Sequence, residues 1–246
     1  MKSSGCMKSS GLKLLTEEIV TCERCPRLRG YCAEIARVKR RAYRDETYWG
    51  KPVPGFGDPK ARLAIIGLAP GAHGANRTGR VFTGDRSGDY LYRALFEAGF
   101  ANQPESRSIN DGLVLQDAYI TGPVRCAPPD NKPSPEEFAR CRPYLERELD
   151  LLTRVRVVVV LGKLASDAYL GILKDRGIIQ TRTAFAFGHG LEHALPTGSP
   201  ALLGCYHPSQ QNTSTGRLTA EMLHDIFVRA RAITEGAITE HAIIEK

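Results

Sequence analysis

The stretch RLAIIGLAPGAHGANRTGRVFTGD, residues 62–85, joins a short apolar run to a long glycine-rich loop. Residues 62–67 are mostly apolar and a proline follows at position 70, which is typical of a buried parallel strand. Glycines let a flat ligand approach the backbone closely, and amides near a helix start can bind anionic oxygens. The loop is not G-x-G-x-x-G and lacks the Gly-Lys-Ser/Thr ending of a P-loop. By itself it favours a flexible loop for a nucleotide phosphate.

The rest of the chain alternates strand and helix patterns. Apolar runs predict the remaining strands at residues 118–121, 155–161 and 201–206. Helical spacing of apolar residues predicts helices at residues 87–98, 163–173 and 219–233. The segment Ser134-Pro-Glu-Glu137 predicts a capping box that opens another helix, which Pro143 is expected to break or kink. Together these patterns predict a three-layer α/β/α fold with a central, mostly parallel four-stranded sheet. Such sheets bind ligands at the carboxyl ends of their strands.

The length of 246 residues suits one α/β domain, which we expect at residues 15–235. Residues 1–14 are expected to be a disordered tail, in which the tetrapeptide MKSS occurs twice, and residues 236–246 a C-terminal tail. No apolar run reaches membrane-spanning length, and the N-terminus has no apolar core of signal-peptide length. We therefore expect a cytoplasmic protein without a membrane partner, associated with the nucleoid in a prokaryotic cell.

The net charge of +7 points only weakly to a polyanionic partner, because charge informs non-specific binding and not fold. Residues 37–44, with the sequence RVKRRAYR, concentrate five cations. Such a run is more often the solvated face of a helix than a stripe that contacts phosphates. The run alone leaves both interpretations open.

Seven cysteines, an odd number, argue against a disulfide framework and for a metal site or free thiols. Cys22 and Cys25 form a C-x-x-C motif, and Cys126 and Cys141 form a second pair. Four thiolates suit a structural zinc ion or a [4Fe–4S] cluster, and their spacing does not choose between the two. The remaining cysteines are interpreted as spares: Cys6, Cys32 and Cys205.

A second strand end carries HPSQQN at residues 207–212, where a lone histidine is more often structural than catalytic. Three separated motifs resemble the uracil-DNA glycosylase superfamily, and most closely its family 5, the iron–sulfur B type. They are GLAPGAHGANRTGRVFTGD at 67–85, RCAPPDNKPSP at 125–135 and YHPSQQNTSTGRLT at 206–219. Residues 38–59 also match, and the resemblance runs from about residue 22 to residue 230.

The resemblance implies a monofunctional DNA-repair glycosylase of that fold. It would excise uracil and other deaminated or modified bases from DNA, leave an abasic site, and act as a monomer. The implied ligands of a [4Fe–4S] cluster are Cys22, Cys25, Cys126 and Cys141. The implied base-binding residues are Gly67, Gly71, Ala72 and Phe82, and the implied DNA-binding residues are Arg77, Ser209, Gln210 and Asn212.

The chemistry of base excision assigns roles to three further residues. Cleavage of the N-glycosidic bond leaves a cationic sugar and an anionic base, so hydrogen bonds to the base and a positioned water promote it. His207 suits the contact with the base, and Asp85 suits the orientation of water opposite the sugar. Asn131 could assist, although a role in the turn PDNKP competes. Phe82 suits stacking on a flipped base, and a position in the core is equally consistent with the sequence.

Two departures from related iron–sulfur glycosylases bear on specificity. Leu68 stands where they carry an acid, and Gly122 aligns with an asparagine that reads the uracil edge. We therefore expect a roomier, less selective pocket, in keeping with the broad substrate range of family 5. One alternative is a non-catalytic DNA-binding protein with the cluster as a structural clip, which would need neither Asp85 nor His207. Another is a nucleotide-phosphate enzyme, which would need a lysine or a metal-binding carboxylate in the 67–85 loop.

Overall fold

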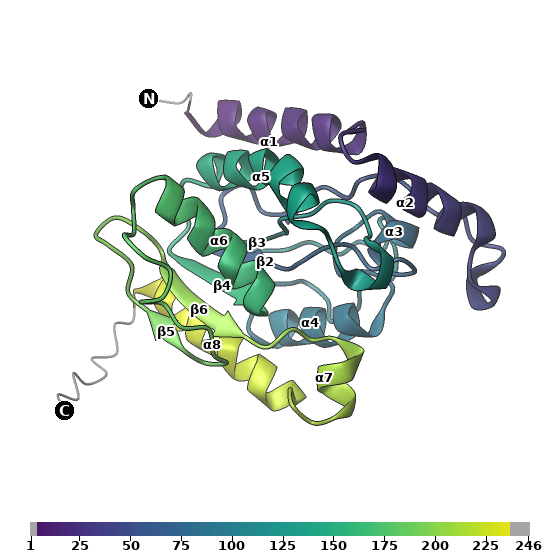
Figure 1. Cartoon of the computed structure of the whole chain (residues 1–246). Coiled ribbons are helices and arrows are strands. Elements are labelled where there is room, and N and C mark those ends of the chain that lie inside the picture. The colour runs from purple at the N-terminus through teal and green to yellow at the C-terminus, as the bar shows by residue number, and fades with distance from the viewer. Residues whose placement is uncertain (1–3, 237–246) are drawn as a thin grey trace.

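A six-stranded sheet runs through the computed structural model, which describes residues 4–236 and their side chains from residue 11 onward (Figure 1). The strands lie in the order β1-β3-β2-β4-β6-β5. Their bounds are β1 Phe56–Gly57, β2 Leu63–Ile66, β3 Ala118–Thr121, β4 Val157–Leu161, β5 Glu192–His193 and β6 Ala201–Cys205. The α-helices are α1 Ser4–Val20, α2 Pro26–Val38, α3 Ala75–Thr78, α4 Arg86–Glu97, α5 Pro135–Leu151, α6 Lys163–Asp175, α7 Gln210–Ser214 and α8 Ala220–Glu235. Two short 3-10 helices are η1 Arg41–Tyr43 and η2 Pro129–Asn131.

The four inner strands are parallel, which confirms the predicted α/β fold. In the centre, Ile65 of β2 pairs with Ile120 of β3 on one side and Val159 of β4 on the other. The expected count of four strands was too low, because β1 and β5 add antiparallel pairs at the two edges. Each of these strands has two residues, too few to produce a periodic apolar pattern.

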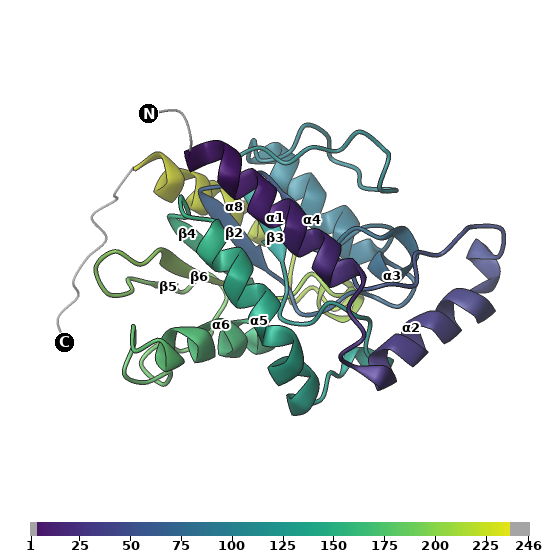
Figure 2. The same cartoon turned by 90° about the horizontal axis from the view of Figure 1, so that it is seen from above.

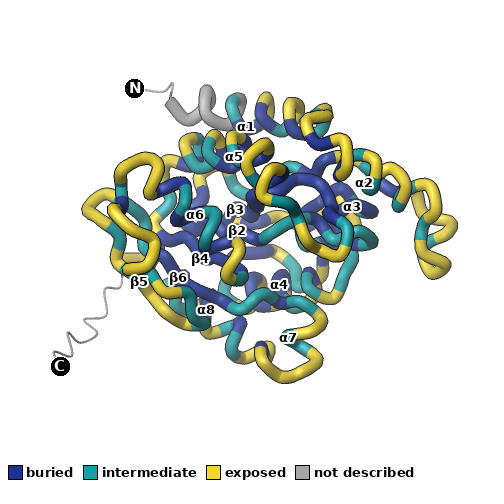
Figure 3. The backbone as a smooth tube through the Cα atoms, in the orientation of Figure 1, coloured by how far each residue is buried: buried dark blue, intermediate teal, exposed yellow. Residues whose placement is uncertain are grey.

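Helices cover both faces of the sheet, as its apolar strands require. Leu63 and Ile65 face the core that α4 and α8 complete, whereas Ala64 and Ile66 face α5 and α6. Neighbouring residues alternate between the faces because strand side chains have a period of two. Strands β2, β3 and β4 are therefore buried along their whole length, and β6 is buried from its second residue onward (Figure 3).

Helix α1 lies alongside α5, outside the main three layers (Figure 2). The structure thus differs from the disordered tail expected at residues 1–14, since the helix begins at Ser4; residues 1–3 lie outside the described residues. Leu12 packs with Ala61 and Leu152, and Leu15 packs with Tyr144 of α5. These long-range contacts stabilise a segment whose own helical pattern is weak. Of the expected tail at 236–246, only Gly236 is described.

Helix α5 begins at the predicted capping box, with Ser134 and Glu137 each bonding the backbone of the other. Of the break or kink expected at Pro143, the break does not occur, because the helix continues to Leu151. A proline removes one helical hydrogen bond. Burial of Tyr144, Leu145 and Glu148 in the turns that follow holds the helix together. The same helix therefore presents both Cys141 and Glu148 to the interior.

The other predicted helices are confirmed to within about two residues at each end. No helix within residues 4–236 is long and apolar enough to cross a membrane.

The packing of α1 predicts unequal effects at two neighbouring leucines. Leu15 is 1% exposed and Leu14 is 59% exposed. Leu15→Ala should lower the free energy of unfolding by about 2–5 kcal/mol, because it leaves a cavity between α1 and α5. Leu14→Ala, the matched control, should leave it nearly unchanged. Urea unfolding of both variants measures the difference, and equal stabilities would show that α1 does not pack as described.

Candidate functional site

A pocket of about 890 Å³ opens at the carboxyl ends of the parallel strands. Its walls come mostly from the loops after β2, β3 and β6, and Arg40, Tyr43 and Val53 add a fourth segment that precedes β1. The predicted site residues that line it are Gly67, Gly71, Ala72, Phe82, Asp85, Asn131, His207, Ser209 and Gln210. The residues that the sequence assigned to the site thus line one pocket at this edge of the sheet.

Asp85 occupies the start of α4. Its Oδ1 accepts a hydrogen bond of 3.0 Å from the N–H of Gly88, which caps the helix. Its Oδ2 lies against two glycines of the loop: a Cβ at Gly74 would be 2.0 Å from this oxygen, and one at Gly71 would be 3.0 Å away. Burial raises the pKa of Asp85, while backbone hydrogen bonds oppose the rise. These glycines thus make room for a carboxylate, and not only for a ligand.

Phe82 and His207 lie side by side in the pocket. Their ring centroids are 5.7 Å apart and their planes are tilted by 34°. A Cβ at Gly67 would lie 2.7 Å from Cε2 of Phe82, so that glycine leaves space for the ring. Burial lowers the pKa of His207 to about 4, and the imidazole is therefore neutral near pH 7. A neutral imidazole can donate one hydrogen bond without bringing a charge into the pocket.

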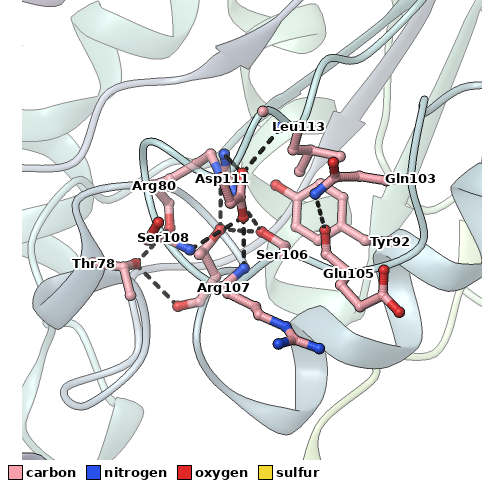
Figure 4. A network of polar contacts seen from close by, with 12 residues as sticks. Thr78, Arg80, Tyr92, Gln103, Glu105, Ser106, Arg107, Ser108, Asp111 and Leu113 are labelled. Atoms are coloured by element: carbon pink, nitrogen blue, oxygen red, sulfur yellow. Dashed lines mark hydrogen bonds and ion pairs between the residues drawn. The ribbon is translucent and has the colours of Figure 1, made fainter.

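The backbone of Phe82 has a φ of 51°, in the left-handed region that phenylalanine rarely adopts. Close to Phe82 in the chain, Arg80 belongs to a network of polar contacts with Asp111 and Ser106 (Figure 4). The Arg80 guanidinium bonds both carboxylate oxygens of Asp111, at 2.9 and 2.6 Å. It also donates to Ser106 at 2.7 Å and to Thr83 at 3.0 Å. The segment that carries Phe82 into the pocket is therefore anchored before Phe82, at Arg80, and after it, at Thr83.

The HPSQQN motif is largely held by its own side chains. Ser209 caps α7 by accepting from the N–H of Asn212 at 3.3 Å. The Asn212 side chain donates to the carbonyl of His207 at 2.8 Å, and Asn212 does not line the pocket. The structure therefore assigns Asn212 to the support of His207 instead of the predicted DNA contact. Gln210 is exposed at the rim, where a contact with DNA is open to it.

Arg77, predicted to bind DNA, is buried instead. Its guanidinium donates to the carbonyls of His73 and Gly84 at 2.8 and 2.7 Å, pairs with Glu46, and lies 3.9 Å over the Tyr43 ring. All these partners belong to the protein, so Arg77 braces the loop. Two of these partners, Glu46 and Tyr43, lie on a distant segment of the chain, so the sequence could not reveal the burial of Arg77.

Asn131 is exposed at the pocket rim with a φ of 56°. Asparagine tolerates this left-handed conformation better than most residues, which supports the turn role that competed with catalysis. The turn role of Asn131 and its predicted role in catalysis are compatible, because the turn needs its backbone conformation and catalysis would use its side chain.

Sequence reasoning missed several residues of the pocket. His73 belongs to the quoted first motif, yet it received no role; its Nδ1 lies 3.0 Å from the Tyr48 hydroxyl. Arg40 and Tyr43 come from the basic run at 37–44. The structure thus brings part of that run to the pocket. The mixture of arginines with an aromatic residue in the run was the sequence signal that could have indicated a place in the site.

Gly122 lies opposite the main chain of Leu68. A Cβ at Gly122 would be 3.3 Å from the Leu68 carbonyl oxygen, which also accepts from the N–H of Val124. The φ of Gly122 is not in the left-handed region, so crowding and not backbone angle favours glycine here. Both residues line the pocket.

The four predicted cysteine ligands line one smaller cavity beside the pocket. They come from the α1–α2 connection, the loop after β3, and α5: Cys22 and Cys25, then Cys126, then Cys141. Within the described residues, no three histidine, cysteine, aspartate or glutamate side chains are arranged around a single metal ion. Burial raises the pKa of the Cys141 thiol to about 11.

The cavity has a cationic wall formed by Arg24, Arg29, Arg125 and Arg140. Four thiolates with an iron–sulfur core are anionic, and this wall suits them. Cys32 is fully buried beside Cys126, yet it does not line the cavity.

Comparison with known proteins agrees with this geometry. Residues 54–230 match the family model of the uracil DNA glycosylase superfamily. The chain belongs to this superfamily. The match contains all three pocket loops together with Cys126 and Cys141, and it begins after Cys22 and Cys25.

Relatives extend the similarity toward the N-terminus. A type-5 uracil-DNA glycosylase of Mycobacterium tuberculosis is 52% identical over 87% of this chain and 79% of its own length. A type-5 uracil-DNA glycosylase of Thermus thermophilus is 49% identical over 88% of this chain and 95% of its own length. A type-4 uracil-DNA glycosylase of Pyrobaculum aerophilum is 30% identical over 67% of both chains. The similarity to type 5 is thus both higher and longer than that to this type-4 member of the superfamily.

The Arg80–Asp111 pair predicts a pH-dependent stability for this superfamily member. Burial alone would raise the pKa of Asp111, but Arg80 and three backbone N–H groups hold it well below its usual range. A lowered carboxyl pKa stabilises the fold fully above the unfolded value of about 3.9, and this contribution is lost as the pH falls from that value through the lowered pKa of the folded state. Asp111→Asn should therefore lower the free energy of unfolding at pH 7 by about 3–5 kcal/mol, and by less near pH 3.

Urea unfolding at both pH values measures this effect. Asp175→Asn is the matched control, since Asp175 pairs with Arg142 at the surface and should matter little at either pH. A loss at Asp111 that does not depend on pH would contradict the assignment of the stabilisation to its charge.

Proposed function

We propose that this protein excises uracil from DNA by hydrolysis of the N-glycosidic bond and leaves an abasic site for base-excision repair. The observation that carries the proposal is the joint presence of Asp85, Phe82 and His207 on the wall of one pocket. The names of the type-5 relatives support the same activity. A DNA-binding protein without catalysis would need no buried carboxylate and neutral imidazole in such a pocket.

Each of the three residues has a role in the proposed reaction. A flipped base stacks on Phe82, whose ring lies beside that of His207. His207, neutral because its pKa is low, donates a hydrogen bond to the base carbonyl as negative charge develops there. Asp85 accepts a hydrogen bond from the attacking water and stands as an anion opposite the cationic sugar. Asn131 assists at the rim.

Cations at the pocket mouth suit the phosphates of the bound strand. Arg40 and Arg86 line the pocket, and both are exposed. We assign phosphate contacts to these two and a rim contact to Gln210, in place of Arg77 and Asn212. The proposal includes action as a monomer, on duplex and single-stranded DNA, in the cytoplasm where its substrate lies.

The pocket wall at Gly122 supports a broad choice of bases. No side chain projects from this position, and the Leu68 main chain lies directly behind it. An amide that reads one base edge would reject other edges by about 1–3 kcal/mol. Without it, we propose that hypoxanthine and C5-modified uracils are also excised.

Labelled duplexes that contain uracil, hypoxanthine or hydroxymethyluracil test the activity directly. After incubation, alkali cleaves the strand wherever a base has been released. Cleavage of the uracil duplex supports the proposed function. Cleavage of the other two duplexes at rates within a few powers of ten of the uracil rate supports the proposed broad choice of bases. Cleavage without alkali would contradict a monofunctional enzyme, and intact strands in all three would overturn the function.

Variants of Asp85 and His207 test the assignment of the site. Asp85→Asn and His207→Ala should each slow single-turnover cleavage of a uracil duplex by at least about tenfold, with DNA binding largely unchanged. Burial raises the pKa of Asp85, so this carboxylate becomes protonated at a higher pH than an ordinary aspartate does. As the pH is lowered, the wild-type rate should therefore begin to fall at a pH above the usual aspartate pKa of about 3.9. Asp89→Asn, on the exposed side of α4, is the control. Wild-type rates in both variants would refute the assignment.

We further propose that Cys22, Cys25, Cys126 and Cys141 bind a [4Fe–4S] cluster. Their common cavity and the arginines that line it support an anionic group. In such a cluster each cysteine binds a different iron. The cluster would tie α2 and α5 to the pocket loop and take no part in cleavage.

Purified anaerobically, the protein should be brown, absorb broadly near 400 nm and hold about four irons per chain. Cys126→Ser should lose iron and stability together, because ligation couples to folding. Cys32→Ala, the control at a buried cysteine outside the cavity, should keep its iron. A colourless protein with stoichiometric zinc would refute the cluster.

A further inference from the structure

Arg125 is a buried cation that belongs to both cavities. Its side chain is 2% exposed, and the residue lines the pocket on one side and the cysteine cavity on the other. Its backbone N–H bonds the thiol of Cys141, and Cys126 follows it in the chain. No other residue of the described chain lines both cavities except Val124.

The guanidinium of Arg125 is only partly satisfied by the protein. Its Nη2 pairs with Glu148, whereas Nε and Nη1 are buried and have no hydrogen-bond partner among the described residues. A buried charged donor without a partner costs more than a neutral one, so native structures rarely leave one in place. The other three arginines of the cysteine cavity differ. Arg29 and Arg140 donate to backbone carbonyls, and Arg24 lies over the Tyr144 ring.

We infer that Arg125 is the buried counter-cation of the cysteine-bound cluster and that its free Nε and Nη1 donate hydrogen bonds to sulfur. This inference rests on the proposed cluster. Thiolate and sulfide sulfurs accept hydrogen bonds, and such bonds tune iron–sulfur sites. Arg125 is thus a positioning residue, since it contacts the cluster and not the reacting atoms of the substrate.

A chain of buried contacts continues from Arg125 to the pocket. Glu148, which binds Arg125, also accepts from the hydroxyls of Thr121 and Tyr119. Thr121 ends β3 and lines the pocket beside Gly122. The cluster, its counter-cation and the pocket wall would therefore share one rigid polar network, which links retention of the cluster to the shape of the pocket.

The reduction potential gives a readout that a merely structural role would not change. Adding an electron to the cluster adds negative charge, and a nearby cation favours that reduced form. Removal of Arg125 should therefore make the potential more negative. Loss of a hydrogen-bonding partner of the cluster should also speed iron release to a chelator, by about 10- to 100-fold if rates follow affinity.

The test compares anaerobically purified variants of the full chain. In Arg125→Met/Glu148→Gln both charges are removed together, so no buried carboxylate is left unpaired. Arg125→Lys keeps the charge but offers fewer fixed donors, and we expect values between the wild type and the double variant. Arg80→Met/Asp111→Asn is the matched control: it removes another buried pair, outside the cysteine cavity, and should leave the potential and the release rate unchanged.

The outcomes separate this inference from the proposals on which it rests. If the wild type holds the cluster and its reduction potential and iron-release rate equal those of the Arg125 variants, the inference about Arg125 is wrong. The cluster proposal itself is then still supported. If the double variant does not fold, Arg125→Lys decides, because it preserves the ion pair with Glu148. If the wild type holds zinc, the cluster proposal fails. Equal rates of zinc release in the wild type and Arg125→Lys would then also overturn the role of Arg125.

Discussion

The buried carboxylate of Glu148 is the point on which the arrangement of the two cavities depends. It lies on α5, is 1% exposed, and accepts from Tyr119, Thr121 and Arg125. A buried carboxylate is costly unless its oxygens are paired, so these partners must lie where they do. Through them, helix α5 is fixed to β3 and to the loop that follows it. Cys141 lies two turns before Glu148 on the same helix, and Cys126 follows Arg125, so the network also sets the distance between two of the cysteines.

The glycine-rich loop acts as a rigid frame and not as a flexible flap. Gly67 leaves space for Phe82, and Gly74 leaves space for the Asp85 carboxylate. The Arg80–Asp111 pair holds the intervening backbone, including the left-handed Phe82. Strained backbone of this kind persists only where the surroundings over-determine it, and it is common at functional sites. The glycines of the loop therefore provide the space that the Phe82 ring and the Asp85 carboxylate occupy.

The pocket controls charge by burial. The same loss of water raises the pKa of Asp85 and lowers that of His207, because burial disfavours each charged form. The neutral imidazole can then approach an electron-rich base, while the helix cap at Gly88 helps Asp85 to keep its charge. Two ordinary side chains thus acquire different tasks from their positions on two loops of one sheet.

The sequence by itself determined the parallel sheet, the capped helices and the three motif loops. Their apolar periods and caps are local patterns, and parallel strands place their carboxyl ends at one edge. It also determined which residues are available for chemistry, Asp85, His207 and the cysteines among them. Only the tertiary structure decided which side chains reach the pocket. Arg77 and Asn212 are of types that bind DNA, yet Arg77 is buried and pairs with the distant Glu46, and the Asn212 side chain bonds the carbonyl of His207. The α1 helix and the unbroken α5 likewise depend on each other's burial, and Arg125 meets Glu148 and Cys141 only after the chain has folded. Burial and long-range pairing follow from contacts between segments, which no local pattern encodes.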